Sequence, residues 1–220
     1  MARLYQTKGK YSEAEPLRRR SLLILEQQLG AKHPDVATSL NNLAGLYNAQ
    51  GKYSEAEPLY RRSLLILKQQ LGAEHPNVAT SLNNLAGLYK TQGKYSEAEP
   101  LYRRSLLILK QQLGAEHPDV ASSLNNLAEL YRTQGKYNEA EPLFQRSLLI
   151  REQQLGAEHP DVANSLNSLA ALYDTQGKYS EAEPLYRRAI TIFKQCLGTD
   201  HPNTQTVQAN YQQCLDQMRS

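Results

Sequence analysis

Histidine is the residue in this sequence that comes closest to suggesting a metal site. Five histidines each precede a proline and stand 42 residues apart, at His33, His75, His117, His159 and His201. A zinc ion needs several ligand atoms within about 2.0–2.3 Å, whereas packed neighbouring helices lie about 10 Å apart. Because each histidine belongs to a different copy of a repeated segment, we expect these residues to flank helix starts and expect no metal site.

A glycine and lysine pair gives a weak signal for phosphate binding. The segment 45–52 ends in Gly51-Lys52, as a phosphate-binding loop does, but five residues rather than four separate its two glycines. Tyr53 stands where such a loop has the Ser or Thr that holds magnesium. The segment is also expected to lie between two helices and not after a strand, so we predict no nucleotide cofactor.

Cysteine and glutamate side chains do not form a catalytic pattern either. Cys214 takes the place of an apolar leucine, and Cys196 follows an apolar pair near a helix end, so neither has the polarising neighbour that a nucleophile needs. Glutamate pairs such as Glu55 and Glu57 fall in the first turn of a helix, where capping and the helix dipole account for them. We predict that the chain is not an enzyme and binds no cofactor.

Composition excludes further classes. The 220 residues hold 25 Lys+Arg and 22 Asp+Glu, a formal charge of +3, and the positive residues are spread along the chain. Nucleic-acid binding needs a concentrated basic face, so it is not expected. The first residues lack the apolar run of a signal peptide or membrane anchor, and two cysteines cannot build a disulfide framework. We therefore expect a cytoplasmic protein that neither enters a membrane nor binds nucleic acid.

The whole sequence recurs with a period of 42 residues, marked by Gly9, Gly51, Gly93, Gly135 and Gly177. Periods of this size are typical of stacked repeats, none of which can bury its apolar face without a neighbour. The sequence therefore predicts an all-α fold, a single α-solenoid over 1–220 in which antiparallel helix pairs form a right-handed superhelix. Its expected parts are a partial first repeat at 1–30, full repeats at 31–72, 73–114, 115–156 and 157–198, and a C-terminal capping helix at 199–220.

Each repeat is expected to contain two helices, as 73–114 illustrates. The first begins at Pro76 and ends before Gly93, because proline suits the first helical position and glycine the turn that follows a helix. The second is expected to open with a capping box from Ser96 to Glu99 and to end before Gly114. The apolar residues of both recur at helical spacing: Val78, Leu82, Leu85, Ala86 and Tyr89 in the first, and Ala98, Leu101, Tyr102, Ser105, Leu106, Ile108, Leu109 and Leu113 in the second.

The two ends depart from the repeat. Met1 aligns with Leu43, so the front half of one helix is missing from the first repeat, and we expect the chain to be an excised fragment. Arg18 stands where the other repeats have Tyr or Phe. At the other end, Gln208 replaces a leucine, as in the polar cap that closes a repeat array.

These segments resemble a known family. The stretches 85–89 and 93–106 resemble the tetratricopeptide repeat, and 113–121 with 124–128 resemble its 42-residue variety, found in kinesin light chains and in bacterial relatives. The resemblance implies a non-catalytic scaffold whose first helices line a concave groove that binds peptides. It does not extend to motor association, because the sustained heptads that would join a heavy chain are missing.

Asparagines in the first helices are the main candidates for ligand contact. Asn is a mediocre helix former, yet pairs recur in mid-helix, and a primary amide both donates and accepts hydrogen bonds. The resemblance supports a ladder of asparagines that holds the backbone of an extended peptide, while the alternative is that one Asn of each pair bonds a neighbouring helix. The candidates are Asn41, Asn42, Asn83, Asn84, Asn125, Asn126 and Asn167, with Asn210 in the cap.

Two series of positions differ among otherwise near-identical repeats. One comprises Gly45, Gly87, Glu129 and Ala171, and the other Asn48, Lys90, Arg132 and Asp174. We expect these residues to select the ligand, although drift on an exposed face would give the same pattern. Lys90 and Arg132 would pair with carboxylates, so the expected partner is a protein with an acidic extended segment. The small residues at Gly45 and Gly87 could instead leave room for an aromatic side chain.

Two other functions remain open at the level of sequence. The chain could be the sensor or assembly module of a multidomain signalling ATPase, or it could associate with itself. In the second case a homodimer would form through apolar residues of the partial first repeat, such as Leu4, Tyr5 and Leu17.

Overall fold

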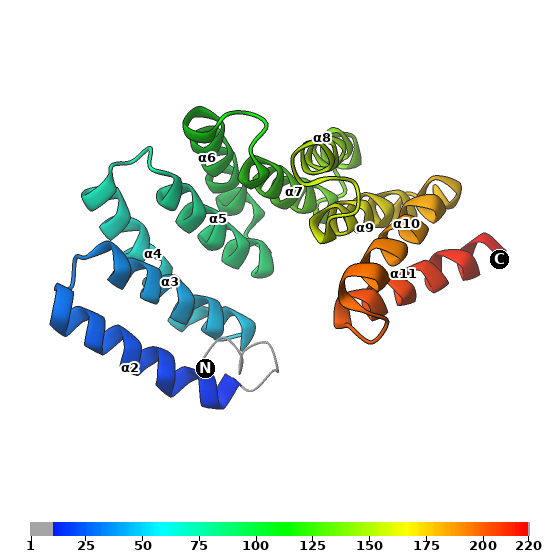
Figure 1. Ribbon diagram of the computed structural model, residues 1–220. Coiled ribbons are helices and arrows are strands. Elements are labelled where there is room, and N and C mark those ends of the chain that lie inside the picture. The colour runs from blue at the N-terminus through cyan, green and yellow to red at the C-terminus, as the bar shows by residue number, and fades with distance from the viewer. Residues whose placement is uncertain (1–10, 220) are drawn as a thin grey trace. The chain divides into compact units, whose positions relative to one another are not determined.

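The computed structural model describes residues 11–219, which form ten helices and no strand (Figure 1). The chain divides into an N-terminal unit, residues 1–112, and a C-terminal unit, residues 113–220. The N-terminal unit holds α2 (Tyr11–Leu29), α3 (Pro34–Ala49), α4 (Tyr53–Leu71), α5 (Pro76–Thr91) and α6 (Tyr95–Leu113). The C-terminal unit holds α7 (Pro118–Thr133), α8 (Tyr137–Leu155), α9 (Pro160–Thr175), α10 (Tyr179–Leu197) and α11 (Pro202–Arg219). None of these helices is long and apolar enough to cross a membrane.

First helices of 16 residues alternate with second helices of 19, and the sequence accounts for the ends of both. His75 is the N-cap of α5: its Nδ1 accepts a hydrogen bond from the backbone N–H of Asn77 at 3.1 Å, and Pro76 follows at the first helical position. Glycines with positive φ follow the helices every 21 residues, from Gly30 to Gly198, because left-handed backbone is accessible to them. The repeated histidines therefore flank helix starts, as predicted.

The predicted capping box is wrong. The second helix α4 begins one residue earlier than its serine, at Tyr53, and its N-cap Lys52 makes no side-chain capping bond. Ser54 Oγ instead donates to the adjacent Glu55 at 2.6 Å. A serine already inside the first turn is too late to accept from the turn's own N–H groups, which is why the motif does not cap here.

Each first helix is buried on a broad face. The five apolar residues predicted for α5 are buried, and so are Ala79, Ser81 and Leu88. The face is wider than a single stripe because α3 and α5 each have a second helix both before and after them: α2 and α4 pack on α3, for example. Within a repeat the helices approach closely where serine meets alanine, and Ser63 Oγ donates to the backbone oxygen of Ala37 at 2.7 Å.

Tyrosines join consecutive repeats by hydrogen bonds. Tyr89 on α5 donates to Glu57 Oε1 on α4 at 2.9 Å, and Arg61 donates both to that carboxylate and to the Tyr89 hydroxyl. Tyr173 bonds Glu141 in the same way in the C-terminal unit, at 3.0 Å. Arg61 lowers the pKa of Glu57, with Tyr89 contributing. The expectation that the helix dipole and capping explain Glu57 therefore needs correction, since this carboxylate links two repeats.

One buried position in α8 carries a charge. Arg151 stands where the other second helices have Leu25, Leu67, Leu109 and Phe193, and it is only 8% exposed. Its guanidinium donates to Ser122 Oγ at 3.1 Å, to Ser165 Oγ at 2.8 Å and to the backbone oxygen of Asp161 at 3.1 Å. Burial lowers the pKa of Arg151. A buried charge thus stands where other repeats have an apolar side chain; its hydrogen-bond acceptors are neutral, and the charge of Asp161 opposes the effect of burial.

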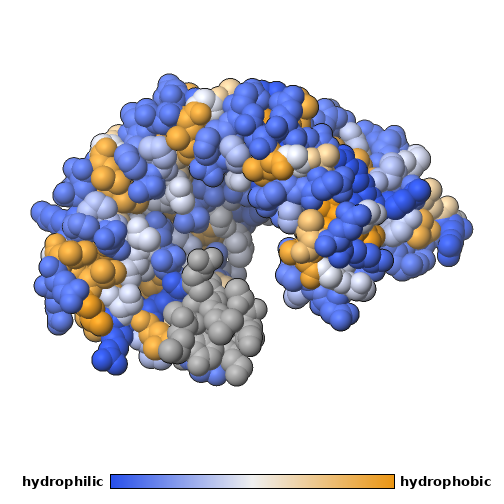
Figure 2. Space-filling view, in the orientation of Figure 1, coloured by the Kyte–Doolittle hydropathy of each residue, from blue (hydrophilic) through white to orange (hydrophobic). Residues whose placement is uncertain are grey.

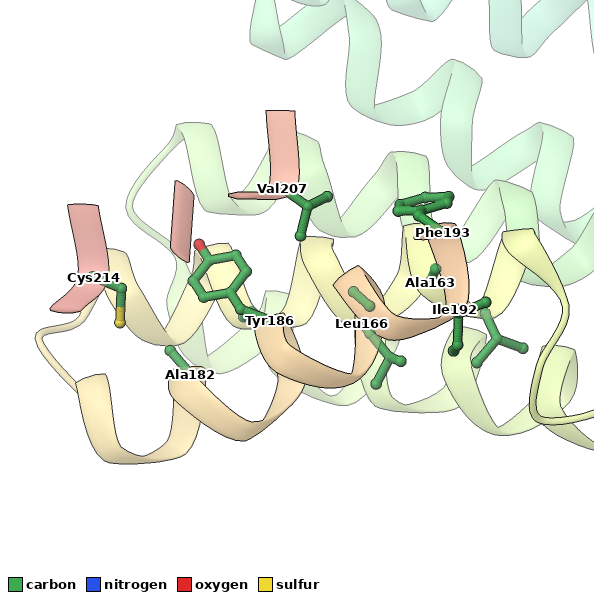
Figure 3. Close-up of a cluster of buried hydrophobic side chains, with 11 residues drawn as sticks. Ala163, Leu166, Ala182, Tyr186, Ile192, Phe193, Val207 and Cys214 are labelled. Carbon is green, nitrogen blue, oxygen red and sulfur yellow. The ribbon is translucent and has the colours of Figure 1, made fainter. Parts of the chain in front are cut away.

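The last helix, α11, closes the C-terminal unit. Its residues Val207 and Cys214 are buried with Tyr186 and Phe193 of α10 in one apolar cluster (Figure 3). The positions that other first helices pack against their own second helix hold glutamine in α11, at Gln205, Gln208 and Gln212. These glutamines are polar where the other first helices bury alanine and leucine. The buried Cys214 also confirms that this cysteine packs in the core, while Cys196 is exposed.

The helix α2 at the other end has an open face. Ile24 is 41% exposed, whereas the equivalent Ile66, Ile108, Ile150 and Ile192 are at most 4% exposed. Ser21 is exposed as well, although its equivalent Ser63 is buried against the paired first helix. A recess of about 350 Å³ lies here, lined mainly by Leu17, Ser21 and Leu25 with the start of α3. The predicted exposure of Leu17 is confirmed, and Leu4 and Tyr5 lie outside the described residues.

Candidate functional site

The predicted ligand-contact residues lie along a polar face of the first helices, which we call the first-helix face. Asn41 and its equivalents share one stripe with the residues four and seven positions later, and Asn42 and its equivalents flank that stripe. In the N-terminal unit this face comprises residues of the adjacent helices α3 and α5, and in the C-terminal unit residues of the adjacent helices α7 and α9. All these side chains are half-buried except that of Asn42, which is exposed. The N-terminal unit holds Asn41, Asn42, Asn83, Asn84 and Lys90, and the C-terminal unit holds Asn125, Asn126, Glu129, Arg132, Asn167 and Asp174.

Asparagines on this face differ in how far the protein satisfies them. Asn210 on α11 donates through Nδ2 to Oδ1 of Asn167 on α9 at 3.1 Å, so here one asparagine bonds a neighbouring helix, as the alternative interpretation expected. The Oδ1 atoms of Asn41 and Asn125, at equivalent positions two repeats apart, are buried and accept no hydrogen bond. A buried acceptor without a donor is costly. These two buried amide oxygens therefore have capacity left for a ligand.

The charges on the first-helix face also differ between the units. Arg132 donates to Glu129 on its own helix at 2.9 and 3.1 Å, so the charge of this arginine is already compensated. Lys90 forms no ion pair with any of residues 11–219. The positive patch predicted from Lys90 and Arg132 is thus reduced to Lys90, because a ligand carboxylate would have to displace Glu129 to reach Arg132.

Asp174 is engaged by a tyrosine of its own repeat. Burial raises the pKa of Asp174, and a hydrogen bond from the Tyr186 hydroxyl opposes that rise. Burial and the charge of Asp174 raise the pKa of Tyr186 well above its ordinary value. Sequence reasoning placed Asp174 on the ligand side but missed this partner.

The glycines of the first-helix face lie over tyrosine hydroxyls. A Cβ built on Gly45 would stand 3.5 Å from the Tyr60 hydroxyl oxygen, and one on Gly87 would stand 3.5 Å from that of Tyr102. The space predicted for an aromatic ligand side chain is therefore bordered by a phenol of the same repeat. Sequence comparison carried a signal for this contact: the repeat with Glu129 in the glycine position has Phe144, without a hydroxyl, in the tyrosine position.

Another recess lies away from the first-helix face, between α4, α5 and α6. It has a volume of about 590 Å³, and its lining includes Leu64, Leu65 and Lys68 of α4 with Leu101 of α6. Leu65 is 55% exposed and belongs to a series of exposed leucines, one on each second helix from α2 to α8. Figure 2 shows hydrophobic residues on one face of the molecule as separate patches among hydrophilic ones. The residues 11–219 contain no group of three or more His, Cys, Asp or Glu side chains placed to hold a metal ion.

Comparisons with known proteins agree with the helix-pair architecture. The family model of the tetratricopeptide repeat matches residues 1–69, 35–111, 92–148 and 119–195. A Podosopora anserina protein with nearly identical TPR-like repeats, described as of kinesin light chain type, is similar at 31% identity, with a TM-score of 0.70 over 88% of this chain and 92% of that one.

A bacterial protein is similar to the same degree. BtubC (BKLC) from P. vanneervenii shares 30% identity, with a TM-score of 0.72 over 91% of this chain and 80% of that one. No curated protein matches the chain. Since the family model covers most of the sequence and the structural relatives are TPR-like, the chain belongs to the tetratricopeptide repeat family.

Proposed function

We propose that this tetratricopeptide repeat scaffold binds extended segments of a partner protein along the first-helix face of each unit. The observation that carries the proposal is the pair of buried amide oxygens, Asn41 Oδ1 and Asn125 Oδ1, that have no donor. An extended peptide exposes a backbone N–H at every residue except proline and can supply that donor. Asn167 Oδ1 is already satisfied by Asn210 and would contribute less.

The charge preference that we propose rests on Lys90. It is half-buried on the first-helix face and has no ion pair in the described part of the chain, so an acidic residue of the ligand can pair with it. Arg132 is held by Glu129 at 2.9 Å and adds little. The ligand segment is therefore expected to be acidic where it passes α5, and neutral side chains are acceptable elsewhere.

A non-catalytic role is consistent with the family. Proteins of the tetratricopeptide repeat fold and the kinesin light chain type act as scaffolds. The histidines at helix starts are engaged as N-caps, and the glutamates of the second helices bond arginine and tyrosine, as His75 and Glu57 illustrate. These side chains have structural partners, which supports assigning the function to binding.

Fluorescence anisotropy tests this proposal. Labelled extended peptides that are acidic with a tyrosine, acidic without one, neutral or basic would be titrated at low and high salt. We expect saturable binding of the acidic peptides. Lys90→Ala should weaken it by about 2–5-fold, the effect of one partly exposed ion pair, whereas Arg132→Ala should change it less.

Asn125→Ala should also weaken binding, and circular dichroism of each variant would control for loss of helix. Equal affinity for acidic and basic peptides, together with an unchanged affinity of the Lys90→Ala variant, would refute the charge preference. If none of the four peptide classes binds, the proposal of an extended-peptide scaffold fails.

Self-association through α2 is a second candidate function, and the open face of that helix favours it. Ile24 is 41% exposed at a position that is buried in every other repeat. Pairing of two copies through this face would remove it from water. Sedimentation velocity over a range of concentrations should then show a dimer that Ile24→Glu abolishes, and a monomer at all concentrations would refute this function.

A further inference from the structure

The first full repeat contains a tyrosine hydroxyl without a partner. Tyr60 on α4 is 4% exposed, and its hydroxyl makes no hydrogen bond with any of residues 11–219. Burial raises the pKa of Tyr60 to about 12, so the phenol is neutral and can donate a proton. The hydroxyl points at the backbone of α3: a Cβ on Gly45 would be 3.5 Å from it. Because Gly45 has no side chain, nothing at this position of the first-helix face covers the Tyr60 hydroxyl.

An unpartnered acceptor stands on the same helix face. Asn48 follows Gly45 by three residues, which places both on one side of α3. Its Oδ1 is buried and accepts no hydrogen bond. Asn41 lies two turns earlier on that side and is in the same state. The face around Gly45 thus combines a neutral donor with acceptors, none of which the protein satisfies.

In the last full repeat, the side chains at the same positions interact with each other and are not free for a ligand. There Tyr186 takes the place of Tyr60, Asp174 that of Asn48 and Ala171 that of Gly45. Burial and the charge of Asp174 raise the pKa of Tyr186, and a hydrogen bond from the phenol opposes the rise that burial causes in the pKa of Asp174, so the two side chains lie close together. This internal comparison indicates that side chains at the two positions lie close enough to interact. In the first full repeat both remain open.

The third full repeat is closed by a different route. Phe144 removes the hydroxyl, and Glu129, in the place of Gly45, covers the position and binds Arg132. Of these three repeats, the first full repeat alone combines a tyrosine hydroxyl, an asparagine acceptor and a glycine that leaves both accessible. Mid-helix glycine is unfavourable to a helix, so its presence at position 45 calls for a compensating role.

We propose that Tyr60, Asn48 and Gly45 form an amide-anchor site that binds one neutral amide group of the extended peptide. The Tyr60 hydroxyl donates to the amide oxygen, Asn48 Oδ1 accepts from the amide N–H, and Gly45 lets the group approach the helix. A carboxylate has no hydrogen for Asn48, and an ammonium group has no acceptor for Tyr60. The ligand group is therefore the side-chain amide of Asn or Gln, which presents its oxygen and one N–H on the same side, whereas the C=O and N–H of a trans main-chain peptide group point in opposite directions. This inference rests on the proposed peptide-binding function and specifies one contact within it.

The chain itself supplies the test substitutions, because each occurs at the equivalent position of another repeat. Tyr60→Phe copies Phe144, Asn48→Asp copies Asp174, and Gly45→Ala copies Ala171. The probe is a displayed library of random peptides selected on the unmodified chain, followed by anisotropy with one selected peptide. We expect each substitution to weaken binding by about 10-fold, the effect of losing one buried hydrogen bond. Tyr186→Phe, at the closed pair, is the control and should leave the affinity unchanged.

A second readout needs no peptide. Tyr60→Phe removes a hydroxyl that bonds none of the described residues and should leave the melting temperature unchanged or raise it, whereas Tyr186→Phe removes the interaction of the phenol with Asp174 and should lower it. If Tyr60→Phe lowers the melting temperature as much as Tyr186→Phe, the hydroxyl has a partner and the inference is wrong.

The remaining outcomes separate the inference from the function. If selected peptides bind but the variants of the amide-anchor site bind them equally well, the inference is wrong and the scaffold function stands. If no peptide is selected, the function and the inference fail together. Within a bound peptide, loss of affinity on changing Gln or Asn to Glu or Asp assigns the contact to a side-chain amide. Unchanged affinity after every Gln and Asn of the peptide has been changed to Glu or Asp would refute the inference.

Discussion

Replacing Arg151 by leucine should stabilise the protein by about 1–2 kcal/mol. The guanidinium is buried in a position where three other second helices place leucine, and its three acceptors are neutral. Withdrawing an ion from water costs several kcal/mol, and well-packed apolar replacements of buried ions are often stabilising by about 1–4 kcal/mol. Burial of a leucine side chain adds about 1.5–3 kcal/mol, and the lost charged hydrogen bonds offset part of both gains.

Loss of the guanidinium should do little harm to its serine partners. Ser122 Oγ still donates to the backbone oxygen of Pro118 at 3.2 Å. Ser165 Oγ would lose its partner, but the equivalent hydroxyls of Ser81 and Ser123 are already buried without one. The repeats therefore tolerate a buried serine hydroxyl without a hydrogen-bond partner at this position.

Thermal unfolding followed by circular dichroism would measure the effect. For a chain of this size a gain of about 1–2 kcal/mol corresponds to a rise of roughly 2–8 °C in the melting temperature. Leu67→Arg, at the equivalent position of α4, is the reverse control and should lower it. If Arg151→Leu lowers the melting temperature, the hydrogen bonds to α7 and α9 outweigh the cost of burying the charge, and the reasoning is refuted.

Two other predictions concern the contacts within and between repeats. Ser63→Ala should lower stability by about 1 kcal/mol because it removes the buried hydrogen bond to Ala37, while Ser21→Ala on the open face should change it little; equal losses in urea titrations would contradict this. The lowered pKa of Glu57 means that its contribution is complete above about pH 4.5 and is lost as the pH falls through that lowered value. Stability should therefore fall in acid, and Glu57→Gln should make the fall shallower when melting temperatures are compared across pH; an unchanged acid profile would count against the link between repeats.

Helices and their ends could be predicted closely from the sequence. The His-Pro pair before α5 and the glycine after it determine where the chain can be helical, and the repeat shows both signals many times. The capping box failed because the same letters fit two registers, and the structure begins α4 one residue before Ser54. Local patterns identify a helix start more securely than its first residue.

The candidate site was only partly predictable. Residue types placed the asparagines on the first-helix face, but whether an amide is free depends on its neighbours. Asn167 is satisfied across a gap of 43 residues by Asn210, whereas Oδ1 of Asn125 accepts no hydrogen bond. Whether Arg132 is available to a ligand also depends on a neighbour, because Glu129 on the same helix binds it. Such pairings depend on side-chain geometry, which periodicity does not describe.

The glutamines of α11 make one face of this helix polar and leave the other apolar. As a result, the two ends of the array differ in how readily a further repeat could pack on them. Its apolar side packs on α10, while Gln205, Gln208 and Gln212 occupy the side to which a following second helix would attach. A designer could graft another copy of the repeat ahead of α2, where Ile24 and Ser21 are ready to receive a first helix. Grafting behind α11 would first require returning three glutamines to alanine and leucine, so lengthening by design is easy from one end alone.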